Sequence, residues 1–222
     1  MIRWLLILLL LAPLAAGAET LVRLDRPVSD ADFHRAVACA ARPGGKCRAA
    51  WVAWGPRARA DLRVALLPAD PGYPVARARL VEAAVRSALE EVNGAGAGLR
   101  MRLVAPGERP HIRIWRSRLH EGDVTRNTPG FPDGIAVGVG QFQIWWNGDR
   151  VLERASILIS SDIAVDHIRS VVLEEIVQSL GLWHDVEGAG YAGRSIFDND
   201  SNMVTRLAGQ DRAILRRHYA PR

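Results

Sequence analysis

The chain has 222 residues and a net charge of +5, and no internal repeat or low-complexity stretch divides it. This length suits one domain with a sizeable hydrophobic core. Nearly all of the basic residues are arginines scattered singly along the chain, whereas a nucleic-acid-binding surface usually shows a clustered basic stripe. We therefore expect a solvated, mildly basic surface and no nucleic-acid partner.

The N-terminus has the pattern of a secretory signal peptide. A positively charged start precedes an apolar run from Trp4 to Ala15, and a small-residue cleavage site ends at Ala18. A membrane span needs about 20 apolar residues, and Glu19 and Arg23 interrupt the run before that length. We expect residues 1–18 to be removed, which leaves a secreted or periplasmic bacterial protein without stable membrane insertion.

Residues 19–60 read as an N-terminal extension that contains the two cysteines of the chain. Cys39 and Cys47 flank the turn signal Pro43-Gly44-Gly45, which would fold the chain back and bring the two thiols together. In an oxidising compartment such a pair forms a disulfide. Two buried free thiols are the alternative, and a metal pair is not indicated because no second Cys/His cluster accompanies them.

Hydrophobic periodicity places the elements that follow. A short helix is expected at residues 32–39, in the extension. Beyond Asp61 the chain predicts, in order, a strand at 62–66, a helix at 75–92, strands near 99–103 and 112–114, a loop at 116–133, a strand run over 135–144, a strand at 156–159, a helix at 165–182 and a closing helix at 209–218.

The helix at 165–182 carries the most specific motif. From position 174 the chain reads E-E-x-x-Q-x-x-G-x-x-H. The zinc-peptidase pattern is H-E-x-x-H, with two His ligands one helical turn apart and Glu as general base. In the extended form of that pattern, a glycine ends the helix and returns a third His to the metal. Glu175, Gly181 and His184 match this frame, whereas Glu174 and Gln178 stand where His is required.

The element order and this motif resemble the catalytic domain of matrixin-like metzincins, over roughly residues 61–219. Ser195-Ile196-Phe197 falls where metzincins place Ser-Ile-Met, and residues 207–219 resemble their closing helix. The E-E-x-x-Q-x-L-G-L motif, Asp185 and Ser-Ile-Phe are also similar to a bacterial family of exported proteins with a domain of unknown function. The resemblance implies an α+β, zincin/metzincin-like single domain at 61–222: a twisted mixed sheet with two long helices and a C-terminal helix.

Two functional interpretations follow from the altered motif. In the first, zinc proteolysis is lost and Glu174 accepts hydrogen bonds from the Gln178 amide and the His184 ring, so that the protein binds a peptide or protein and no cofactor. In the second, the protein is an atypical metal-dependent hydrolase or peptidase. Glu174, Gln178 and His184 would then hold zinc or another divalent cation, and Glu175 would act as the base.

The resemblance also places the run from Gly134 to Ile144 as the strand that borders the cleft. An edge strand can take up an extended peptide by strand addition, and Gly138 and Gly140 would leave room for the backbone of a partner. Three tryptophans near the expected cleft either grip a ligand or pack the fold: Trp145, Trp146 and Trp183.

Overall fold

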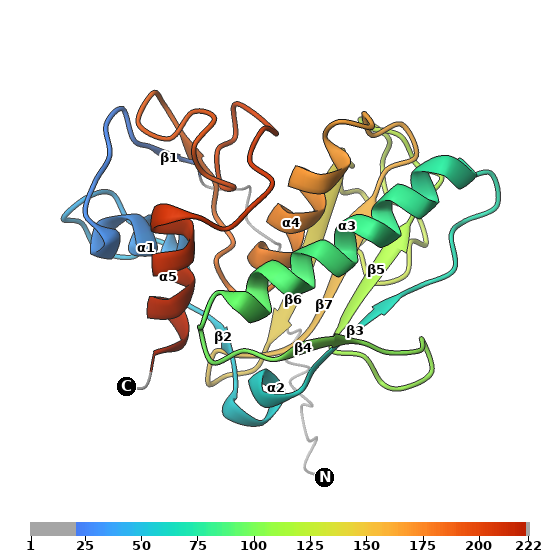
Figure 1. Cartoon of the computed structure of the whole chain (residues 1–222), viewed down its shortest axis with the longest axis horizontal. Helices are drawn as coiled ribbons and strands as arrows, with labels where there is room; N and C mark the ends of the chain where they lie inside the picture. Colours follow the sequence, from blue (N-terminus) through green and yellow to red (C-terminus); the bar gives the residue numbers. More distant parts are fainter. Residues whose placement is uncertain (1–20, 221–222) are drawn as a thin grey trace, which may run out of the picture.

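A computed structural model describes residues 21–220 of the chain. The expected signal peptide lies outside these residues. Within them, no helix is both long enough and apolar enough to cross a membrane. The described residues form one α+β domain with a largely parallel sheet and five helices, of which Figure 1 shows the arrangement.

The centre of the molecule is a six-stranded sheet. Five strands run parallel in the order β2, β7, β5, β3, β4, and β6 pairs antiparallel with β7. These segments form strands because β-branched and aliphatic residues recur at alternate positions. The side chains at those positions lie on one face of the strand and are buried in the core. The strands are β2 (Ala53–Trp54), β3 (Leu62–Leu66), β4 (Met101–Leu103), β5 (Ile112–Arg116), β6 (Gly140–Trp146) and β7 (Val151–Ile159).

Two helices cover one face of this sheet. They are α3 (Val75–Gly94) and α4 (Ile168–Gln178), which pack against each other in front of the strands in Figure 1. The buried residues of α3 recur at helical spacing and form a single apolar stripe. In contrast, α4 is buried almost all round, as expected for a helix enclosed by the sheet, α3 and the C-terminal region.

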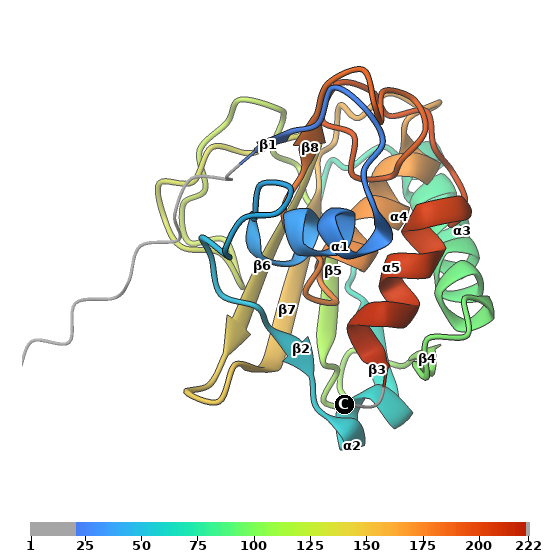
Figure 2. The ribbon, with the colours of Figure 1, turned by 90° about the vertical axis from the view of Figure 1, so that its left-hand side faces the viewer.

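The opposite face of the sheet is covered in part by the long connection between β5 and β6. Phe131 and Val137 of this connection pack on Leu158 of β7, with Leu119 beside them, and form a small second core. Figure 2 shows this connection on the side of the sheet away from the helices. The rest of that face carries polar and aromatic side chains.

The segment before Asp61 is built into the domain. Its helix α1 (Asp30–Cys39) packs against the closing helix α5 (Gly209–Tyr219), beside the sheet in Figures 1 and 2. The two-residue strand β1 (Val22–Arg23) pairs in parallel with β8 (Val186–Glu187), and a short helix, α2 (Pro56–Ala60), leads into β3.

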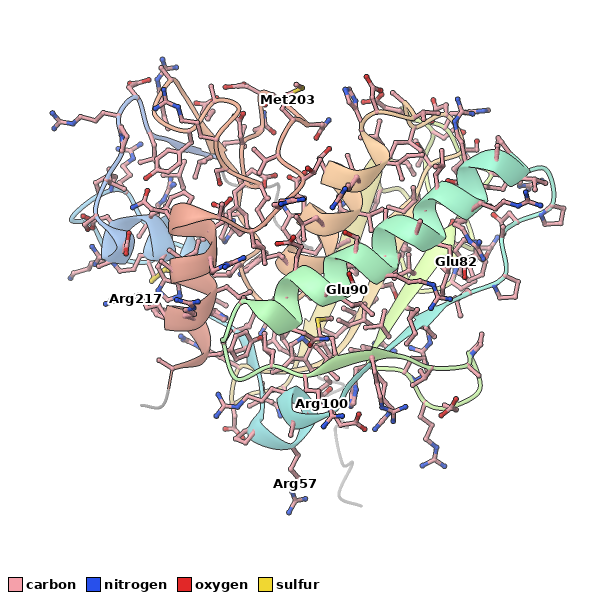
Figure 3. The ribbon with its side chains drawn as sticks, in the orientation of Figure 1. Arg57, Glu82, Glu90, Arg100, Met203 and Arg217 are labelled. Carbon is pink, nitrogen blue, oxygen red and sulfur yellow. A yellow bond between two sulfur atoms is a disulfide. The ribbon has the colours of Figure 1, made fainter. Side chains whose placement is uncertain are left out.

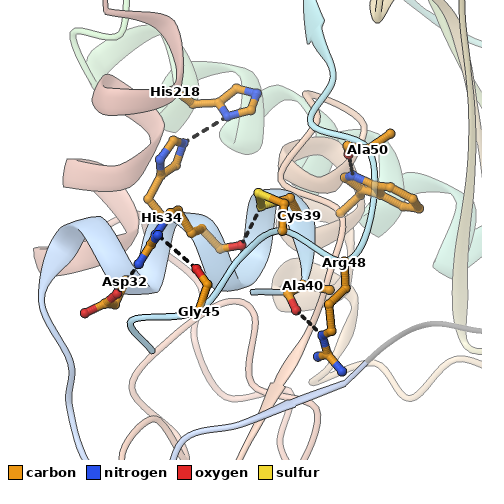
Figure 4. The surroundings of a disulfide bond; sticks show 11 residues. Asp32, His34, Cys39, Ala40, Gly45, Arg48, Ala50 and His218 are labelled. Carbon is orange, nitrogen blue, oxygen red and sulfur yellow. Dashed lines mark hydrogen bonds and ion pairs between the residues drawn. A yellow bond between two sulfur atoms is a disulfide. The ribbon is translucent and has the colours of Figure 1, made fainter. Parts of the chain in front are cut away.

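Cys39 and Cys47 form the disulfide that their spacing predicts, with 5.1 Å between their Cα atoms. Figure 4 shows this bond beside a contact between two buried histidines. The Nε2 atom of His34 in α1 lies 3.0 Å from Nδ1 of His218 in α5, and the other ring nitrogen of His218 lies 3.0 Å from the Val52 carbonyl oxygen. The two helices are therefore joined through a polar contact inside the apolar packing.

Several of the predicted boundaries were wrong. The strand expected at 156–159 begins at Val151. The motif helix begins at Ile168 instead of 165 and ends at Gln178, and a turn leads to Gly181. Gly181 has φ +98°, and a Cβ atom there would lie 2.2 Å from the Val52 carbonyl oxygen, so only glycine fits. The strand expected from residue 135 begins at Gly140, because the preceding residues instead form a bridge between Val124 and Ala136.

The basic surface is dispersed, as the sequence predicts. Arg57 in α2, Arg100 before β4 and Arg217 in α5 are exposed and lie on different parts of the surface in Figure 3. Several other arginines pair locally with acidic residues, for example Arg102 with Asp61 at 2.6 Å. Exposed pairs of this kind contribute little to stability.

Candidate functional site

The altered motif folds into a compact group of polar side chains at the end of α4 and in the turn that follows. We call these residues the motif cluster: Glu174, Glu175, Gln178, His184 and Asp185. Four of them are buried and Glu174 is half-buried. The turn at Gly181 reverses the chain, which brings Asp185 back to α4.

Gln178 is the centre of the hydrogen bonding in the motif cluster. Its Nε2 atom donates to Asp185 Oδ1 at 2.6 Å and to Glu174 Oε1 at 3.5 Å, the latter at the outer limit of a hydrogen bond. The expected bond between Gln178 and Glu174 is therefore present but weak. The stronger partner is Asp185, which was not expected in this role.

His184 does not join this network. Neither of its ring nitrogens has a hydrogen-bond partner among residues 21–220, although the residue is only 3% exposed. The expected hydrogen bond from its ring to Glu174 was wrong, because the ring instead packs on Trp183 with 4.2 Å between centroids. Burial lowers the pKa of His184 to about 4, and Arg48 acts in the same direction. The ring is therefore neutral at pH 7, with two unsatisfied polar atoms.

Glu175 faces the edge strand β6. A Cβ atom added to Gly140 would lie 2.5 Å from Glu175 Oε1 and equally close to Val171 Cγ1, so the glycine makes room for α4. At Gly138 an added Cβ would meet the Gly140 carbonyl oxygen at 2.8 Å. On the Cβ side of both glycines the chain itself therefore fills the space. The expectation that they leave room for the backbone of a partner along the strand edge stays a prediction.

Strand alternation divides the tryptophans that were expected together near the cleft. Trp146, at the end of β6, lies 5.9 Å from Trp183 between ring centroids, and Trp183 leads directly to His184. Trp145 points to the opposite face of the sheet, where Arg154 lies over its ring at 4.1 Å. Thus β6 contacts the motif region at both ends: Gly140 meets Glu175, and Trp146 meets Trp183.

Strand β6 is an edge strand, because among the described residues it pairs with β7 alone. The Ser160 N–H donates to the Val139 carbonyl oxygen, one step beyond the strand. In an antiparallel ladder the bonded pairs alternate, so Phe142 and Ile144 of β6 direct their N–H and C=O groups away from β7. Ala155 of β7 lies opposite Ile144, and its N–H donates to the His111 carbonyl oxygen, on the β5 side. Ala155 and Ile144 are therefore not hydrogen-bonded to each other, which supports this assignment.

The side chains of two glutamines partly cover this outward edge. Gln141 and Gln143 donate through Nε2 to the carbonyl oxygens of Phe142 and Ile144, at 3.5 and 3.2 Å respectively. The N–H groups of Phe142 and Ile144 point away from β7 in this register, and no hydrogen bond from either group to another part of residues 21–220 is present. The edge therefore presents two free donors and two weakly covered acceptors in the spacing of an unpaired strand.

The Ser195-Ile196-Phe197 turn is held by the closing helix. The Asp211 carboxylate accepts hydrogen bonds from Ser195 Oγ at 2.7 Å and from the Ile196 N–H at 3.0 Å. Burial raises the pKa of Asp211 to about 6 even though these bonds act in the opposite direction. Phe197 is fully buried and packs edge-to-face on Phe33 of α1.

The motif cluster in this arrangement does not fit the expected metal site. Because Gln178 directs its NH2 group at Glu174, the two meet as donor and acceptor and not as two oxygen ligands. Within the motif cluster, only His184 presents buried nitrogens without a hydrogen-bond partner among residues 21–220. No group of three His, Cys, Asp or Glu side chains in the described part of the chain is arranged to hold a metal ion.

Residues 81–222 match the family described as Protein of unknown function (DUF2927), and this match covers more than half of the chain. The chain belongs to this family. The matched DUF2927 region starts within α3 and includes β4 to β8, α4, α5 and the motif cluster. No curated protein matches the chain. The family description names no activity.

Proposed function

We propose that this DUF2927 protein is an exported, zincin-like binding protein that takes up an extended peptide segment along β6 and does not cleave it. The observation that carries the proposal is the unpaired outer edge of β6, where the N–H groups of Phe142 and Ile144 point outward without a partner among the described residues. A peptide laid antiparallel or parallel to this edge would satisfy them by strand addition.

The surroundings of β6 support peptide binding at this place. The Gln141 and Gln143 amides make long hydrogen bonds to outward carbonyls and can be displaced at low cost. Trp146 is 39% exposed at the end of the strand and offers a large apolar surface for a side chain of the peptide.

The zincin-like part of the proposal rests on the order and placement of the elements. The order of strand, long helix, four strands, motif helix, turn and closing helix is the one that the resemblance implies. Gly181 turns the chain after the motif helix, and Asp211 holds the Ser-Ile-Phe turn. The absence of proteolysis is inferred from Gln178, which donates to Asp185 where a zinc peptidase would present a His ligand.

A scan of peptide N-methylation tests the binding mode directly. Linear peptides would be selected from a random phage-displayed library on the immobilised protein and resynthesised with single N-methyl groups. Strand addition uses the N–H groups of every second peptide residue. We therefore expect that N-methylation at alternate peptide positions greatly weakens binding to the protein. At the positions between them, the methylated peptide should bind about as tightly as the unmethylated peptide. Losses without this period of two, or no selectable peptide, would contradict the proposal.

Restoring the missing ligands tests the zincin-like geometry separately. The double variant Glu174→His/Gln178→His would place two imidazoles one helical turn apart, with His184 as the third ligand. We expect it to bind one zinc ion, measured by mass spectrometry of the folded protein after dialysis. The same variant with His184→Ala is the control and should lose the metal. A folded double variant without zinc would mean that His184 cannot reach the two introduced imidazoles, and would contradict the zincin-like geometry.

A further inference from the structure

A second cavity lies on the face of the sheet that is opposite to α3 and α4. Its volume is about 570 Å³, within the usual range for small-ligand sites. Ile112 and Ile114 of β5 enter the core, so the alternating residues Arg113 and Trp115 face this cavity. Trp145 of β6 and Arg154 of β7 enter it from the neighbouring strands.

Two guanidinium groups in this cavity lack a counter-ion. Neither Arg113 nor Arg154 makes an ion pair or hydrogen bond with the side chains or backbone of residues 21–220, and no carboxylate lines the cavity. The nearby Asp70 is occupied, because it accepts from Trp115 Nε1 at 2.9 Å and from Ser117 Oγ at 3.3 Å. The cavity therefore has an excess of positive charge that its own walls do not neutralise.

The cavity wall is shaped by a close contact between a loop and the sheet. Gly130 has φ +81°, and a Cβ atom there would lie 2.2 Å from Ser156 Oγ of β7. This contact holds Phe131 and the flanking prolines against the sheet, where they form the apolar side of the cavity. Flat aromatic surfaces and cationic groups thus line one cavity that is open to solvent.

We propose that this cavity, which we call the arginine–tryptophan pocket, binds a small organic anion: a carboxylate or phosphate group carried on a flat ring. The anionic group would lie between Arg113 and Arg154, since a guanidinium pairs well with either oxyanion. The ring would lie on the indole of Trp115 or Trp145. This ligand is separate from the peptide at β6, because Trp145 and Trp146 point to opposite faces of the strand.

Titration of the tryptophan fluorescence of the purified protein tests this proposal. Phenyl phosphate and benzoate are the probes. Inorganic phosphate is the control that carries the anion without a ring, and benzyl alcohol is the control that carries the ring without an anion. We expect saturable binding of at least one probe, at least tenfold tighter than that of either partial compound. The probe that binds more tightly distinguishes a phosphate ligand from a carboxylate ligand.

The double variant Arg113→Gln/Arg154→Gln removes the two charges of the pocket. It should bind the probe at least tenfold more weakly than the wild type and keep the same melting temperature. The matched control is Arg57→Gln/Arg217→Gln, which removes two exposed arginines elsewhere on the surface and should bind like the wild type (Figure 3). If the double variant does not fold, Arg154→Gln alone, at an exposed side chain, serves the same comparison. Equal binding by variant and control, or no saturable binding of either probe, would overturn the proposal.

Discussion

His184 combines almost complete burial with the absence of hydrogen-bond partners among the described residues, and this has a consequence for stability. Its pKa is about 4 in the folded protein, compared with an ordinary value of 6.5. Between these pH values the unfolded chain binds a proton that the folded protein does not. The contribution of His184 to stability is therefore complete above about pH 6.5 and is lost as the pH falls toward 4.

Comparison with His184→Leu isolates this effect. The free energy of unfolding of the wild type should fall by up to about 3 kcal/mol more than that of the variant between pH 7 and pH 4. Urea unfolding of both proteins at several pH values measures this difference. Asp211 titrates in the opposite sense, but it is present in both proteins and cancels. Parallel pH profiles would show that the imidazole of His184 is not buried as described.

Asp211 acts as the clamp between α5 and the Ser195–Phe197 turn. Asp211→Asn places an NH2 group against one of its two donors, Ser195 Oγ or the Ile196 N–H, and leaves a buried donor unsatisfied. We expect the free energy of unfolding to fall by about 1–3 kcal/mol. Chemical denaturation checks this, with Asp149→Asn at an exposed carboxylate as a control of near-zero effect. A loss no larger than in the control would contradict the role of the clamp.

At the scale of elements, the contact between β6 and α4 depends on Gly140. Gly140→Ala would force its Cβ atom against Glu175 and Val171, and should cost about 1–3 kcal/mol. Gly148→Ala, in the turn after β6 where an added Cβ meets nothing within 4 Å, is the matched control. Glu175→Ala combined with Gly140→Ala should restore part of the loss, which a double-mutant cycle quantifies. Additive losses would show that the two residues are not in contact.

The sequence predicted the elements that carry a regular hydrophobic period and missed those that do not. Helices α3 and α5 lie where helical spacing places them. One apolar stripe specifies α3, and α5 buries Ile214, Leu215 and Tyr219 at helical spacing. The two-residue strands β1, β2 and β8 are too short to show a period, and distant chain segments pair with them. The start of β6 was misplaced because alternating glycine and valine before Gly140 imitates a strand.

The candidate site was predictable in identity but not in geometry. The motif identified Glu174, Glu175, Gln178 and His184, and these residues lie at the end of α4 and in its turn. The bond between Gln178 and Asp185 depends on how the turn at Gly181 returns the chain, which local spacing does not determine. The arginine–tryptophan pocket joins three strands and a loop, and therefore gives no signal in a single stretch of sequence.

At the scale of the whole molecule, the disulfide anchors the segment that joins α1 to the sheet. In the chain-entropy account, closing this short loop contributes about 2–3 kcal/mol. Cys39→Ala/Cys47→Ala should lose stability by that amount in chemical denaturation, and reduction of the wild type should reproduce the loss. A variant as stable as the oxidised protein would contradict this estimate.

Export is the expectation that links the cysteines to the N-terminus. We expect the mass of protein recovered from the periplasm or the medium to be that of a chain that begins at Glu19. The disulfide should make this mass two units lower than that of the reduced form, which intact mass spectrometry measures. A retained N-terminus or two free thiols would contradict the expected export.

The central claim is that the outer edge of β6 is open and takes up a peptide. Residue-resolved amide hydrogen exchange by NMR tests it most directly, in the free protein and with a peptide selected on it. We predict fast exchange at Phe142 and Ile144 and slow exchange at Gln141 and Gln143 in the free protein, because only the latter pair donates to β7. Peptide binding should then protect Phe142 and Ile144. Slow exchange at these two amides in the free protein, or protection that appears elsewhere on binding, would contradict the account.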